Sequence, residues 1–270
     1  PFIVVLIVVA ALPIRLYGVG YGLPFLYNPD EPIFVDAALG ILRNRDPNPH
    51  WFGAPAGPTI YMLAALYVAI FAVGRVSGAF GSTDDFVKLY QSDPTILYLS
   101  GRLLSAVFGI LTICLVYWIA RRLFNRTTAW AAAAMIMLSP IHLQYSQLVR
   151  MDVEMGVFLL VAFWFCLNIY DRGAWRDYVL SGTFTGIAVV TKYPAAVFGL
   201  TFGLAHVLGR RSWPRDLLKL VAAGLACLVA AVFASPFLFI DYRAALADIL
   251  FEARPTHLSA TGEGLLQHLA

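Results

Sequence analysis

The chain has 270 residues, of which 60% are hydrophobic and only 13% are charged, and its formal net charge is +3. A mean hydropathy of +0.75 is too high for a soluble domain with a polar surface, so the composition predicts an integral membrane protein. Stretches such as residues 130–138 (WAAAAMIML) lack the in–out alternation of a barrel strand. The expected fold class is therefore an all-α polytopic bundle.

Seven segments are predicted to span the membrane as helices, because each is apolar and almost uncharged. They cover about residues 1–17, 97–120, 128–144, 153–170, 178–191, 194–209 and 217–237. A further apolar stretch at 59–74 is shorter than the roughly 20 residues of a full span, which suits a re-entrant or interfacial helix. The alternative is that this stretch is an ordinary eighth span.

The connections between the later segments differ in charge. Arginine is concentrated in residues 121–127, 171–177 and 210–216, and the positive-inside rule makes these connections cytoplasmic. The intervening connections at 145–152 and 191–193 are then external. Going back along the chain, residues 18–96 form one external loop if 59–74 does not cross, and residues 238–270 lie outside as well.

The first candidate site is NPDEP (28–32), directly after the first span. It places Asp30 and Glu31 at the start of a helix predicted by the apolar spacing of residues 33–42, which Asn28 or Asp30 can cap. Asp30 is a candidate catalytic carboxylate, with the N-cap role as its alternative. Glu31 is its candidate partner, with a simple complement to the helix dipole as the alternative.

Two further polar stretches, YSQLVRMDVE (145–154) and TKYP (191–194), fall on the same predicted side. Ionisable residues at membrane depth are costly and usually have a partner or a function. Arg150, Asp152, Lys192 and the adjacent Tyr193 are therefore candidate donor-binding residues. The alternatives are an interfacial pair of Arg150 with Asp152, and a Lys192 that only reaches to the lipid headgroups.

Arg102 lies inside a predicted span, where it either pairs with an acid of the external loop or caps the outer end of its helix. The single histidines His50 and His142 have no ligand spacing, so they indicate packing or interfacial roles. Cysteines 114, 166 and 227 lie inside apolar runs without metal-ligand spacing, which predicts neither a disulfide nor a zinc site.

Cations and carboxylates on one face of the membrane suit one chemistry in particular. Cations hold a phosphate at headgroup level, and a carboxylate removes a proton from an attacking hydroxyl. A divalent metal is the other use of such carboxylates, and Asp30 and Asp152 are the candidate ligands for it. The combination predicts transfer of a group from a phosphate-bearing membrane lipid.

These stretches carry a family resemblance. Residues 28–67, together with YSQLVRMDVE and TKYP, resemble the membrane glycosyltransferases of the GT-C class. The polyprenyl-phosphate-sugar-dependent families, which include protein O-mannosyltransferases and lipid A aminoarabinose transferases, are the most similar. The resemblance covers most of the chain and implies a module of about seven spans over residues 1–237. Residues 238–270 are interpreted as the start of a further external loop, in a chain that looks truncated.

The resemblance implies inverting transfer of a sugar from a polyprenyl-phosphate donor to an acceptor hydroxyl on the outer face of the cytoplasmic membrane. Asp30 is the implied general base, with Glu31 beside it. Lys192 is implied to contact the lipid phosphate, with Arg150 as a helper and Asp152 as the acid of the second loop. The implied partners are the lipid-linked sugar and membrane lipids, with no nucleic acid.

One departure from the family pattern bears on metal dependence. Aminoarabinose transferases carry Glu-Lys-Pro where this chain has GAPAGP (53–58), so a metal ligand and a phosphate-binding lysine of that subfamily are missing. A divalent metal cofactor therefore stays an open alternative. Two other functions are also kept as alternatives, a transporter or flippase-like protein and a non-catalytic membrane subunit.

Overall fold

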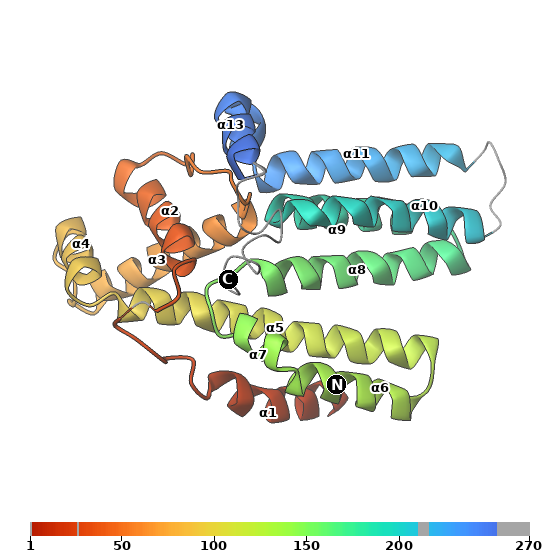
Figure 1. The fold of residues 1–270 in the computed structure, drawn as a ribbon, viewed down its shortest axis with the longest axis horizontal. Coiled ribbons are helices and arrows are strands. Elements are labelled where there is room, and N and C mark those ends of the chain that lie inside the picture. Colours follow the sequence, from red (N-terminus) through yellow and green to blue (C-terminus); the bar gives the residue numbers. More distant parts are fainter. Residues whose placement is uncertain (1, 26, 210–215, 253–270) are drawn as a thin grey trace, which may run out of the picture.

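The computed structural model describes residues 2–25, 27–209 and 216–252, and the regular structure in this part of the chain is entirely helical (Figure 1). The prediction of an all-α protein is confirmed. The elements are α1 (Phe2–Leu16), α2 (Glu31–Asn44), α3 (Gly57–Val76), α4 (Thr83–Ser92), α5 (Thr95–Leu123), α6 (Arg126–Leu138), α7 (Pro140–Tyr145), α8 (Asp152–Asp171), α9 (Trp175–Thr191), a 3₁₀ helix (Tyr193–Phe198), α10 (Gly199–Leu208), α11 (Leu217–Ala234), α12 (Phe237–Ile240) and α13 (Tyr242–Glu252).

Four helices of the described chain are long and apolar enough to cross a membrane, namely α3, α5, α8 and α11. The other predicted spans are shorter or interrupted. The segment 128–144 is divided into α6 and α7, because Pro140 lacks an N–H group and begins a new helix after Ser139. The segment 194–209 begins with the 3₁₀ helix before α10. The four helices fit a multi-pass protein. By helix length and composition, the described residues do not confirm the predicted count of seven spans.

Helix α3 is longer than the apolar stretch from which it was predicted. It has 20 residues, so the length argument against a full crossing no longer applies. Its position differs from that of the bundle helices. In Figure 1 it lies beside the start of α5, beyond the start of α8 and the ends of α9 and α11. Helix α5 has 29 residues and is about 43 Å long at 1.5 Å per residue, more than the bilayer core requires. The interfacial placement of α3 stays a prediction.

Helices α9 and α11 pack closely through two glycines. A Cβ atom on Gly182 would lie 2.0 Å from the carbonyl oxygen of Ala223, and one on Gly186 would lie 2.1 Å from that of Cys227. Small residues at such positions let two helix backbones approach, which is a common basis of packing within membranes. This contact holds the end of α9, where Lys192 follows, against α11.

The two ends of the bundle differ in composition. Figure 1 places the α5–α6 and α8–α9 connections, both rich in arginine, at one end of the bundle together with the start of α11. Helices α2, α3, α4 and α13 gather at the opposite end. Most of the third arginine-rich connection, at 210–215, lies outside the described residues, as does 253–270 of the predicted last loop. Residues 145–152 and 191–193 lie at the same end as α2 and α3, and their external location stays a prediction.

Candidate active site

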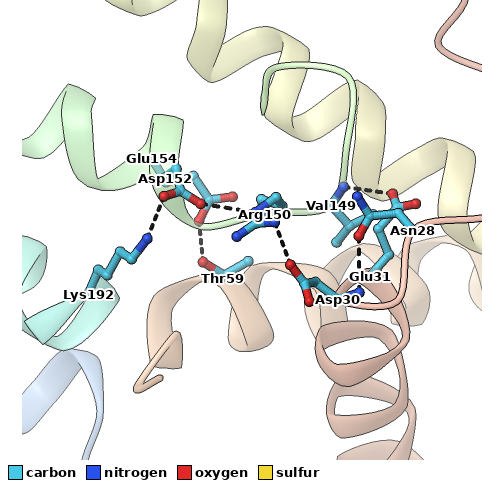
Figure 2. A network of polar contacts seen from close by, with 9 residues as sticks. All are labelled: Asn28, Asp30, Glu31, Thr59, Val149, Arg150, Asp152, Glu154 and Lys192. Carbon is cyan, nitrogen blue, oxygen red and sulfur yellow. Dashed lines mark hydrogen bonds and ion pairs between the residues drawn. The ribbon is translucent and has the colours of Figure 1, made fainter. Parts of the chain in front are cut away.

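Asp30 lies at the N-terminus of α2, but its side chain does not cap the helix. Its own N–H donates to Oδ1 of Asn28 at 3.0 Å, and the carboxylate makes no capping hydrogen bond. The carboxylate instead accepts a hydrogen bond from Nη1 of Arg150 at 2.5 Å (Figure 2), and the Asp30 side chain is 45% exposed. Asp30 therefore occupies the N-cap position of α2 without capping the helix through its side chain, and its carboxylate is available at the surface of the site.

Glu31 points the other way, into the protein. Its carboxylate is fully buried and accepts two hydrogen bonds from Arg102, from Nε at 2.8 Å and from Nη2 at 2.7 Å. It also accepts the backbone N–H of Val149 at 2.8 Å. Of the two roles left open for Arg102, the structure shows the pairing with an acid of the first loop. Glu31 thus joins α2, α5 and the segment before α8, directly beside Arg150.

Arg150 and Lys192 share the carboxylate of Asp152. Nε of Arg150 lies 3.1 Å from Oδ2 of Asp152, and Nζ of Lys192 lies 2.5 Å from Oδ1. Figure 2 shows the resulting row of alternating charges, Lys192, Asp152, Arg150 and Asp30, with Asn28 at the end opposite Lys192. The side chains of Arg150, Asp152 and Lys192 are between 18% and 28% exposed, so these three charged groups are partly shielded from water.

The fold explains why residues so distant in sequence meet. Asp152 is the first residue of α8 and Lys192 follows the last residue of α9. Because α8 and α9 are consecutive antiparallel neighbours, the start of one and the end of the other lie at the same end of the bundle (Figure 1). Arg150 additionally lies over the ring of Tyr145, with its guanidinium carbon 5.0 Å from the ring centroid, which restricts its direction.

Tyr193 joins the lysine-containing turn to the first loop. Its hydroxyl donates to the carbonyl oxygen of Phe52 at 2.9 Å, and the N–H of Ala56 donates to the carbonyl of Thr191 at 3.2 Å. The residues directly before and after Lys192 are therefore both hydrogen-bonded to the first loop. This contact gives Tyr193 an observed structural partner, while its predicted role in donor binding stays a prediction.

A further buried carboxylate lies behind the row and was not singled out from the sequence. Glu154 is 1% exposed and accepts a hydrogen bond from the hydroxyl of Thr59, at the start of α3. The two residues face each other in Figure 2 close to Asp152. Glu154 could have been identified from the sequence, because it is a second acid in the first turn of a predicted span, two positions after Asp152. A charge there is costly without a partner.

The carboxylates of the row, Asp30 and Asp152, pair with the protein's own cationic side chains. In the described ranges, no three His, Cys, Asp or Glu side chains gather in a way that would hold a metal ion. Asp30 and Asp152, the candidate metal ligands, face each other across the guanidinium of Arg150, which occupies the position between them. His50 contacts Asp46 and His142 contacts Arg15, both away from this row. Asp30 and Asp152, each paired with Arg150, therefore do not fit a divalent ion.

A comparison with known families supports an enzymatic role for this arrangement. The family described as dolichyl-phosphate-mannose-protein mannosyltransferase matches residues 97–240, more than half of the chain, and the match includes Arg150, Asp152 and Lys192. No curated protein and no solved structure matches the chain. Membership favours an enzyme over the transporter and subunit alternatives. The chain belongs to this mannosyltransferase family and is a multi-pass membrane glycosyltransferase that uses a lipid-phosphate sugar donor.

Proposed function

We propose that the protein transfers a sugar, with inversion, from a polyprenyl-phosphate donor to an acceptor hydroxyl, and that the charged row is its active site. The observation that supports this best is the row itself. Asp30, Arg150, Asp152 and Lys192 come from three separate parts of the chain and are joined in one continuous set of ion pairs. The row combines cations that can hold a phosphate with an exposed carboxylate that can accept a proton, and these are the two requirements of the reaction.

The donor is proposed to bind at the Lys192 end. The ammonium group of Lys192 and the guanidinium of Arg150 balance the charge of the lipid phosphate as it departs. Asp152 holds both cations in place through separate oxygens. Directly after Lys192, the 3₁₀ helix and α10 expose Val197 and Leu200 (70% and 75% exposed), an apolar surface along which a polyprenyl chain can lie.

Asp30 is proposed to activate the acceptor at the other end of the row. Arg150 binds Oδ2 of Asp30, and the described residues give Oδ1 no hydrogen bond, which leaves that oxygen to accept the hydroxyl proton. The hydroxyl oxygen forms a bond to the anomeric carbon while the bond from that carbon to the phosphate oxygen breaks. The phosphate takes the bonding electron pair and Asp30 takes the proton, which gives inversion in a single displacement.

The placement of this reaction in the membrane follows from the charge distribution. The catalytic module is proposed to comprise residues 1–237, with about seven crossings and α3 at the interface. The arginine-rich connections lie at the end of the bundle opposite the row. With those connections in the cytoplasm, the row faces the outer side of the cytoplasmic membrane.

The experiment uses the full-length protein in lipid-like micelles and native mass spectrometry with added polyprenyl phosphate. The wild type is expected to retain the lipid and Lys192→Ala to lose it. Lys88→Ala is the matched control, because Lys88 is a 75% exposed cation on α4, outside the row. Equal retention by the wild type and Lys192→Ala would contradict the phosphate site.

Transfer from polyprenyl-phosphate mannose in native membranes tests the base. Asp30→Asn keeps the shape of the side chain but cannot accept the proton, so transfer is expected to fall roughly 10²–10⁴-fold. The same variant is expected to retain polyprenyl phosphate, because Asp30 lies at the far end of the row from Lys192. Transfer by Asp30→Asn at the wild-type rate would remove Asp30 from the mechanism.

A further inference from the structure

A groove of about 890 Å³ opens beside the charged row, between α1, α7 and the segment that joins α1 to α2. Its wall includes three tyrosines with largely exposed side chains, Tyr17, Tyr21 and Tyr27. Leu143 and Gln144 of α7 form part of the opposite wall. The groove is separate from the surface around Lys192, since none of its lining residues comes from α8, α9 or α10.

The groove reaches the Asp30 end of the row. Asn28, Pro29 and Leu148 belong to its lining, and they precede Asp30 and Arg150 by one or two positions along the chain. In Figure 2, Asn28 lies at one end of the row and Lys192 at the other. A molecule in the groove and a phosphate at Lys192 would therefore approach the centre of the row from opposite sides.

The chemistry of the groove is neutral, apolar and aromatic. Among the described residues that line it, only Arg102 is charged, and its guanidinium is engaged by Glu31 and by the carbonyl oxygens of Val19 and Tyr21. The side-chain amide of Gln147 donates to the carbonyl oxygen of Tyr17 at 2.6 Å, which fixes the wall where α1 ends. The described lining therefore offers no unpaired cation to a phosphate and no carboxylate to a basic group.

The groove is also continuous with a surface suited to lipid. Pro13 and Ile14 of α1 line it, and the same helix exposes Val9 (64%) and Leu12 (41%) on its outer face. Helix α1 is one of the shorter apolar helices of the chain. An apolar chain lying against α1 can therefore extend from the bilayer into the groove, while tyrosine side chains suit the headgroup level and pack against sugar rings.

We propose that this groove binds the acceptor, and that the acceptor is a neutral, hydroxyl-bearing lipid, such as a glycolipid, that enters from the bilayer along α1. The inference rests on the proposed function, because a single displacement requires the attacking hydroxyl and the departing phosphate on opposite sides of the anomeric carbon. With the phosphate at Lys192, the hydroxyl arrives at Asp30 from the side of Asn28, where the groove opens.

Photocrosslinking in native membranes tests the proposed ligand. A benzophenone amino acid replaces Leu143 in the full-length protein, and the mass of each crosslinked adduct is measured. The control position is Leu225, which is 58% exposed on α11 and reports the surrounding bulk lipid. We expect an adduct with a neutral hydroxyl-bearing lipid at position 143 that is enriched several-fold over position 225. A polypeptide adduct, a polyprenyl phosphate adduct, or the same lipids at both positions would overturn the proposal.

A variant that fills the groove supplies a second, independent measurement. Leu143→Trp is expected to lower transfer to the endogenous membrane acceptors roughly tenfold or more, the size of steric discrimination in an apolar pocket. Its retention of polyprenyl phosphate in native mass spectrometry is expected to equal that of the wild type, and Leu225→Trp is the matched control for both assays. Unchanged transfer, or loss of polyprenyl phosphate in Leu143→Trp, would overturn the acceptor groove, whereas failure of the proposed function would appear separately in Lys192→Ala and Asp30→Asn.

Discussion

The adjacent carboxylates Asp30 and Glu31 have different environments, which supports different roles for them. Asp30 is partly exposed on the charged row, whereas Glu31 is buried in a bidentate ion pair with Arg102. The helix geometry of α2 separates their directions, because neighbouring residues on a helix point about 100° apart. The first acid is thus available for chemistry, and the second holds the loop that carries Arg150.

Glu31→Ala is expected to destabilise the protein by about 3–5 kcal/mol, because it leaves the buried guanidinium of Arg102 without a counter-charge. Thermal unfolding in detergent measures this loss, with Asp84→Ala on the exposed α4 as the control. A Glu31→Ala protein of wild-type stability that had lost transfer would instead place Glu31 in direct contact with the substrates.

Thr59 and Glu154 provide a second prediction at this scale. Thr59→Val keeps the shape of the side chain but removes the hydroxyl that donates to the buried carboxylate of Glu154. The expected cost is about 1–3 kcal/mol of stability, because Glu154 loses its donor. Thr59→Ser restores a hydroxyl and is expected to behave as the wild type in the same unfolding measurement. Equal stability of the valine and serine variants would show that the bond contributes nothing.

At the scale of the elements, the charged row depends on how closely α9 packs against α11. Gly186→Ala would bring a Cβ atom against the backbone carbonyl of Cys227, which cannot move without separating the two helices. The expected loss of stability is about 1–3 kcal/mol, the usual cost of overpacking. Because Lys192 follows α9, binding of polyprenyl phosphate is expected to weaken as well.

Gly224→Ala is the matched control for this contact, because Gly224 lies on α11 and a Cβ there would meet no atom within 4 Å. Unfolding temperatures of the two variants, recorded in the same detergent, provide the comparison. Equal stability of Gly186→Ala and Gly224→Ala would mean that the close packing of α9 against α11 does not contribute to the stability of the protein.

At the scale of the whole molecule, the bundle has two chemically different ends. Arg122, beside Asn168 and Asp171, marks the arginine-rich end, and the charged row with α2 and α3 marks the other (Figure 1). If the positive-inside rule orients the protein, the two ends face opposite compartments.

Cysteine labelling tests this orientation in intact cells. Single cysteines replace Asn44 of α2 and Arg176 of α9, both exposed and at opposite ends of the bundle. A membrane-impermeant maleimide is expected to label position 44 in intact cells and position 176 only after lysis. The native cysteines lie inside α5, α8 and α11, where they are buried or half-buried. Labelling of position 176 alone in intact cells would reverse the proposed orientation.

The sequence by itself determined the class of protein, the positions of most helices and the group of polar residues that form the charged row. These features follow from local composition: apolar stretches become membrane helices, and ionisable residues at their ends are costly enough to indicate a function. Asp30, Arg150, Asp152 and Lys192 were identified in this way, and the structure brings all four together.

Only the tertiary structure decided how each of these residues is used. The burial of Glu31 against Arg102, the contact of Thr59 with Glu154 and the groove beside Asn28 all join segments far apart in the chain. Side-chain direction at a helix start and the space left between packed helices depend on those distant partners, and no local pattern encodes them. The physical reason is that polarity along a chain predicts which residues need a partner, whereas packing selects the partner.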